Sequence, residues 1–67
     1  MLSARNQFKG KVKSVKLGGV MAEVIVSVDS LEFVSAITRG SAEHLGLKVG
    51  DEVMVVVKST EVLIAKD

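Results

Sequence analysis

A chain of 67 residues is one domain at most, and we expect a single domain over residues 1–67. A chain of about 60 residues buries only about 60% of its unfolded surface, so its hydrophobic core is marginal. The absence of cysteine excludes disulfides and thiolate metal sites as compensation, and the 48% hydrophobic content therefore favours self-association. The net charge of +1 does not by itself predict a polyanionic partner.

The N-terminal residues and the apolar runs predict a cytoplasmic protein with no membrane partner. Residues 1–7 are mostly polar, and no apolar run approaches the roughly 20 residues that would span a bilayer. Five basic residues precede the first acid, and this could indicate a nucleic-acid surface, an anion site or the solvated face of an edge strand. They are Arg5, Lys9, Lys11, Lys13 and Lys16.

Three strands are predicted in the first part of the chain. Residues 7–15 alternate lysines with less polar residues, which is the period-two pattern of a strand with one wet face. Gly10 within this strand suggests a bulge or a close backbone approach. Two glycines at 18–19 form a turn, and residues 20–28 and 31–38 again alternate as strands.

The second part of the chain predicts one turn of helix and two more strands. Ser41 is a candidate N-cap for a helical turn over residues 42–45, and Gly46 can end that turn in the left-handed conformation. Residues 53–57 are wholly apolar and predict a buried strand, and residues 62–65 predict the last strand. The predicted fold class is therefore all-β, a five-stranded OB-like barrel with a short helical turn between strands three and four.

The apolar residues exceed what one small barrel interior can hold. Several strands are apolar on both faces, and the surplus would suit a subunit interface. The surplus residues are Val20, Met21, Ile25, Val34, Met54 and Val56.

The polar residues offer little for catalysis. His44 is the only histidine, and neither cysteine nor tyrosine is available to replace it as a general base or nucleophile. The eight carboxylates show no spacing typical of a metal site. Phe8 and Phe33 lie at core-phased positions, which leaves no aromatic platforms for nucleic-acid bases. We therefore expect no enzyme, catalytic residue, metal ligand or cofactor, and no nucleic-acid partner.

Three segments instead combine the donors that a tetrahedral dianion requires. Residues 3–7 and 58–60 each join a cation to hydroxyl or amide groups. Thr38, with Ser41 nearby, lies where the helical turn begins and backbone N–H groups are unpaired. Serine, threonine and lysine are also ordinary turn residues, so composition alone leaves both interpretations open.

These segments resemble the molbindins, small proteins made of a single molybdate-binding domain, and the resemblance covers essentially the whole chain. The matching motifs are Ser3-Ala4-Arg5-Asn6-Gln7, Gly10-Lys11-Val12, Ala36-Ile37-Thr38 with Ser41, Leu45-Gly46-Leu47, Gly50-Asp51-Glu52-Val53 and Lys58-Ser59-Thr60-Glu61-Val62. The resemblance implies an OB-type barrel, dimers that exchange N-terminal strands, and a hexamer built as a trimer of dimers. It also implies molybdate or tungstate at subunit interfaces.

The resemblance assigns roles to nine residues. Arg5 and Lys58 would be the cations, while the remaining residues would donate hydrogen bonds or flank the site. These are Ser3, Ser59, Thr38 and Ser41 as donors, with Ala4, Asn6 and Thr60 as flanking candidates. Asn6 could equally be a structural turn or interface residue. Whether Arg5 and Lys58 meet within one chain or across an interface is left open by the sequence.

The predicted function is binding of molybdate or tungstate for intracellular storage and homeostasis. Sulfate, another tetrahedral dianion, is the main rival ligand. The alternative is a regulatory or DNA-associated β-barrel that places Lys9, Lys11 and Lys13 on phosphates. That alternative predicts an affinity for duplex DNA that falls steeply with salt.

Overall fold

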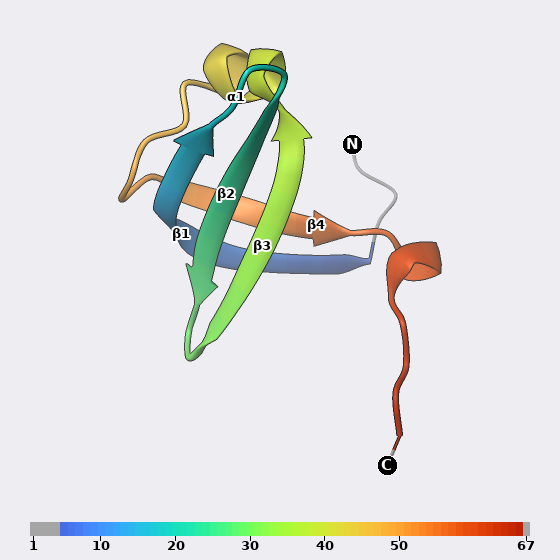
Figure 1. The fold of residues 1–67 in the computed structure, drawn as a ribbon. Coiled ribbons are helices and arrows are strands. Elements are labelled where there is room, and N and C mark those ends of the chain that lie inside the picture. Colours follow the sequence, from blue (N-terminus) through green and yellow to red (C-terminus); the bar gives the residue numbers. More distant parts are fainter. Residues whose placement is uncertain (1–4, 67) are drawn as a thin grey trace.

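The computed structural model describes residues 5–66, which form a four-stranded antiparallel sheet in the order β3-β2-β1-β4 (Figure 1). The elements are β1 (Asn6–Leu17), β2 (Met21–Val28), β3 (Leu31–Thr38), α1 (Arg39–Leu45), β4 (Glu52–Val57) and the 3-10 turn η1 (Ser59–Glu61). The mostly β class, the first four predicted strands and the helix between the third and fourth strands are confirmed. The burial predicted for the fourth strand was wrong, because Met54 and Val56 are 44% and 38% exposed on one face of it.

Strand β1 is long and bent, and it pairs with two neighbouring strands. Residues 6–11 pair with β4, and residues 11–17 pair with β2. The register shifts between Val12 and Ser14, and such a bulge bends a strand and increases its twist. Figure 1 shows β1 curving from its run beside β4 to its run beside β2. Because β1 and β4 are antiparallel, the start of β1 lies at the end of β4.

Gly10 lies where β1 changes partners, and the predicted close approach at this glycine is confirmed. A Cβ atom at Gly10 would come within 2.5 Å of the Ser27 carbonyl oxygen and 2.8 Å of methyl groups of Val26 and Val28. Only a residue without a side chain permits this contact between β1 and β2.

Valines form the core on one face of the sheet. Val12, Val24, Val26 and Val28 are buried together, in agreement with the alternation predicted for the second strand. Partly buried residues from the other elements pack against them: Val15, Phe33, Ile37, Leu47, Val53 and Val55. Strands β3 and β4 are the two sheet edges, and residues from both line an open apolar cavity of about 740 Å³. The core is therefore covered incompletely by the described residues.

The fifth strand predicted over residues 62–65 is not formed. This segment is irregular and extends from η1 away from the sheet (Figure 1). Leu63 and Ile64 are 92% and 88% exposed. A strand requires hydrogen-bonding partners on a neighbouring strand, and the described chain brings neither of its sheet edges to this segment. The prediction of a strand over residues 62–65 was therefore wrong for this chain, although the segment is apolar.

Candidate functional site

The pairing of β1 with β4 brings two of the predicted anion-binding segments together. Asn6 is paired with Val57 in this antiparallel ladder. Continuing the register by one residue places Arg5 opposite Lys58. Within one chain, these two cations therefore lie at neighbouring strand ends, next to the last pair of the ladder.

A side-chain hydrogen bond joins the two segments at the last pair of the ladder. The Asn6 amide Nδ2 donates to the Val57 carbonyl oxygen over 3.2 Å, and Asn6 is half-buried. Beyond Lys58 the chain enters η1, where the Glu61 N–H donates to the Lys58 carbonyl oxygen over 2.9 Å. The backbone is therefore hydrogen-bonded on both sides of Lys58.

Arg5 and Lys58 bring uncompensated positive charge to this end of the sheet. Both residues are exposed. The ion pairs within residues 5–66 are Lys13–Glu32 and Arg39–Glu43, and neither involves them. Like charges at opposing strand positions repel each other. A dianion bound between the two side chains would relieve this repulsion.

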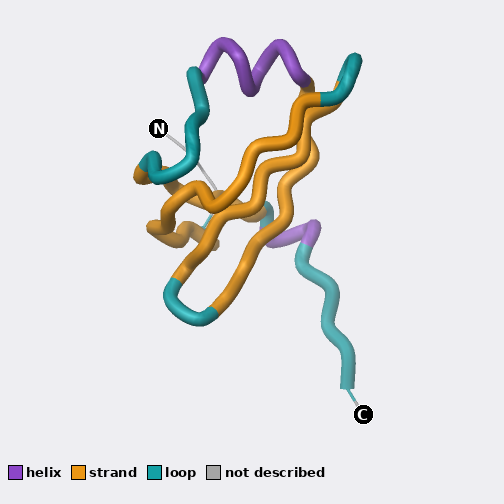
Figure 2. The backbone as a smooth tube through the Cα atoms, turned by 60° about the vertical axis from the view of Figure 1, so that its left-hand side comes forward, coloured by secondary structure: helices purple, strands orange, loops and turns teal. Residues whose placement is uncertain are grey.

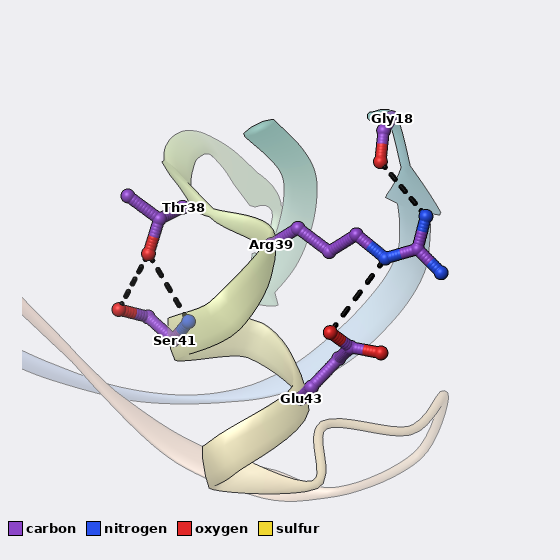
Figure 3. A network of polar contacts seen from close by, with 5 residues as sticks. All are labelled: Gly18, Thr38, Arg39, Ser41 and Glu43. Carbon is purple, nitrogen blue, oxygen red and sulfur yellow. Dashed lines mark hydrogen bonds and ion pairs between the residues drawn. The ribbon is translucent and has the colours of Figure 1, made fainter. Parts of the chain in front are cut away.

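The third predicted segment forms the start of α1 (Figure 3). Thr38 is the N-cap, with its Oγ1 accepting from the Ser41 N–H over 3.1 Å. The same oxygen donates to Ser41 Oγ over 2.8 Å, so the Ser41 proton can point to a further acceptor. The prediction of Ser41 as N-cap was wrong, because the helix begins three residues earlier than Ala42, at Arg39. The left-handed Gly46, at φ 64°, is confirmed.

Arg39 was missed by the sequence reasoning, and it attaches α1 to the hairpin between β1 and β2. Its backbone N–H donates to the Val20 carbonyl oxygen over 2.7 Å, and its Nη1 donates to the Gly18 carbonyl oxygen over 3.1 Å. Nε lies 3.6 Å from a Glu43 carboxylate oxygen (Figure 3). The i, i+4 spacing of Arg39 and Glu43 was the available signal for this ion pair.

The described structure does not bring all the predicted site residues into one cluster. Arg5, Asn6, Lys58, Ser59 and Thr60 belong to the β1–β4 end or to η1. Figures 1 and 2 both show α1, which carries the third segment, at a separate end of the sheet from η1.

Two further predicted site residues, Ser3 and Ala4, lie outside the described residues.

The lysines of β1 do not form a uniformly basic face. Acidic residues lie opposite or bonded to three of them: Lys11 with Glu52, Lys16 with Glu23, and Lys13 with Glu32. Alternating charge of this kind is typical of a solvated sheet surface rather than of a phosphate-binding surface. The arrangement disfavours the DNA-associated alternative.

Residues 5–66 contain no group of three His, Asp or Glu side chains that could hold a metal ion. Within the same range, no helix has the length and apolar character needed to cross a membrane.

The comparisons with known proteins agree on one family. The TOBE domain matches residues 2–64, so the chain belongs to the TOBE-domain family. Within it, "Molybdenum-pterin-binding protein 3" of Clostridium pasteurianum is 50% identical over 64 residues, covering 94% of each chain. The predicted molbindin resemblance is thereby confirmed.

Solved structures give the same result. A molybdate-binding protein from Sporomusa ovata superposes with a TM-score of 0.94 at 38% identity, covering 98% of both chains. The cytoplasmic molybdate-binding protein ModG superposes with a TM-score of 0.82 at 38% identity, over 88% of this chain and 43% of that one. The sheet and helix described above are therefore the OB-like fold of this family.

Proposed function

We propose that this protein binds molybdate or the near-identical tungstate in the cytoplasm and holds it for storage and homeostasis, without chemistry on the anion. The observation that supports the proposal is the β1–β4 ladder, whose last pair, Asn6 and Val57, directly adjoins Arg5 and Lys58 in the sequence. Neither cation is in an ion pair within the described residues. The choice of anion is supported by the relatives, which are named as molybdate-binding or molybdenum-pterin-binding proteins.

The proposed site combines charge with directed donors. Arg5 supplies a planar fork of N–H groups, and Lys58 supplies a point charge. We expect Ser59 and Thr60, together with Ser3 and Ala4, to offer the anion hydroxyl and backbone groups, while Asn6 flanks the site. Thr38 and Ser41 lie at a separate end of their own chain, so in this proposal they reach the anion from a second copy.

We propose further that copies assemble into a hexamer, a trimer of dimers, with the anion between subunits. The exposed apolar segment 62–65 supports this assembly, as do the open cavity and the two uncovered edges, β3 and β4. In the proposed dimer this segment of one copy pairs with an edge of the other and completes a five-stranded barrel. The exchange of N-terminal strands that the resemblance implies is a second way to join the two copies, because residues 6–10 of β1 pair with β4 alone.

Molybdate and tungstate are expected to raise the melting temperature of the protein. A ligand at 100 times its dissociation constant stabilises the folded state by about 2.7 kcal/mol. For a domain of this size that stabilisation corresponds to about 10–20 °C. Differential scanning calorimetry with molybdate, tungstate, sulfate and chloride measures the effect. A melting temperature that is the same in molybdate as in chloride would contradict the proposal, and an equal response to sulfate would remove the selectivity.

Replacing Leu63 and Ile64 together by serine is expected to dissociate the oligomer. Each leucine or isoleucine side chain buried at an interface contributes about 1.5–3 kcal/mol, and both would be lost in every copy. Val49→Ser is the matched control, because Val49 is also exposed, at 69%, but lies in the turn before β4. Native mass spectrometry compares the three proteins. An intact oligomer in the double variant would show that the C-terminal segment does not join the subunits.

A further inference from the structure

We propose that Asn6 is a positioning residue of the oxyanion site, which holds Lys58 beside Arg5 before the anion arrives. The inference rests on the proposed function and assigns Asn6 a role different from that of a ligand. In this role its side chain bonds to the protein backbone, and it acts on the anion only through Lys58.

The need for such a residue arises from the charges at the end of the β1–β4 ladder. Arg5 and Lys58 directly adjoin the last pair, Asn6 and Val57, so one further step of the same register would set two exposed cations against each other. Their repulsion favours separation of the two strand ends when no anion is bound. Strand and helix ends are also the parts of a fold that open most readily.

The Asn6 side chain opposes this separation. Its Nδ2 group donates to the carbonyl oxygen of Val57, the residue directly before Lys58, over 3.2 Å. The bond joins residues that are 51 positions apart in the sequence and is partly buried. The Lys58 carbonyl oxygen accepts from the Glu61 N–H on the other side. The Asn6 amide therefore adds a side-chain bond at the last pair of the backbone ladder, directly before Lys58.

Holding the cations in place before binding strengthens the binding itself. A site that is ordered in advance loses less conformational entropy when the ligand arrives. The position also suits a neutral amide, because a carboxylate there would face the Val57 carbonyl oxygen without a proton to donate and would repel the dianion.

A double-mutant cycle on the full-length protein separates this role from direct ligation. The variants are Asn6→Ala, Lys58→Ala and the two combined, and molybdate affinity is measured by calorimetric titration. Loss of one hydrogen bond predicts that Asn6→Ala weakens binding about three- to tenfold. In the Lys58→Ala background the same substitution is expected to change affinity less than twofold, because the group that Asn6 positions is already missing. Ser14→Ala is the control on the same strand, since Ser14 pairs with Ile25 of β2 instead of β4.

Hydrogen exchange without molybdate tests the structural step directly. In Asn6→Ala we expect faster exchange of the backbone amides of residues 57–61, with the rates of Ser14→Ala unchanged from the unsubstituted protein. This readout does not depend on anion binding, so it distinguishes failure of the inference from failure of the proposed function.

Three results would overturn the inference. Equal losses of affinity from Asn6→Ala in both backgrounds would identify Asn6 as a direct ligand. If Asn6→Ala left the molybdate affinity unchanged while Lys58 was present, Asn6 would be dispensable to the site. Unchanged exchange of residues 57–61 would show that the amide does not hold this segment.

Discussion

Arg5→Ala is expected to weaken molybdate binding about tenfold to a hundredfold, on the scale where about 1.4 kcal/mol is one decade. A dianion taken from water requires fixed positive charge, and a hydrogen bond to a charged group contributes about 1.5–3 kcal/mol. Arg5 offers a planar fork of donors, directly precedes the last pair of the β1–β4 ladder and has no ion-pair partner among the described residues. Calorimetric titration measures the change in affinity.

Two further variants show whether the effect belongs to this side chain. Arg5→Lys is expected to recover only part of the affinity, because lysine lacks the planar fork of donors. Lys9→Ala removes a cation from the same strand at a position opposite Met54, and we expect it to leave affinity nearly unchanged. If Arg5 only anchored the N-terminal segment to a neighbouring subunit, native mass spectrometry of Arg5→Ala would show a change in assembly rather than a loss of affinity in an intact oligomer. Unchanged affinity in an intact oligomer would exclude Arg5 as a ligand.

The features predicted well from the sequence are those set by neighbouring residues. The alternation in residues 20–28 predicted one buried face, and Val24, Val26 and Val28 are buried. Gly46 was predicted to end the helix because a left-handed residue is needed there, and it does so. Each of these predictions depends on a local steric or periodic requirement that residues a few positions apart already express.

The features that the sequence could not supply depend on partners far along the chain. Residues 62–65 can form a strand only where they pair with the edge of a sheet, and the local sequence does not indicate such an edge. The pairing of Asn6 with Val57, which brings the segments of Arg5 and Lys58 together, follows from the register of β1 against β4 and is a property of the fold. Thr38 and Ser41 carry similar hydroxyl groups, so composition alone could not identify the N-cap.

Gly10 is the position where we expect a single methyl group to have the largest effect on stability. The Cβ of alanine would lie 2.5 Å from the Ser27 carbonyl oxygen and 2.8 Å from methyl groups of Val26 and Val28. The first of these atoms belongs to the backbone of β2, so the strands themselves must move apart. Forcing atoms into a packed interior costs about 1–3 kcal/mol, and valine at this position is expected to cost more than alanine.

Gly10→Ala is therefore expected to lower the melting temperature by about 5–20 °C, since 1 kcal/mol corresponds to roughly 4–8 °C in a domain of this size. Gly19→Ala is the matched control, because a Cβ there meets nothing within 4 Å. Calorimetry in the absence of molybdate measures both variants. The displaced strand also pairs with β4 through Gly10 and Val53, so we expect the substitution to disturb the Arg5–Lys58 end of the same ladder and to reduce molybdate affinity as well. Equal melting temperatures for Gly10→Ala and Gly19→Ala would show that β1 and β2 do not approach as closely as this packing requires.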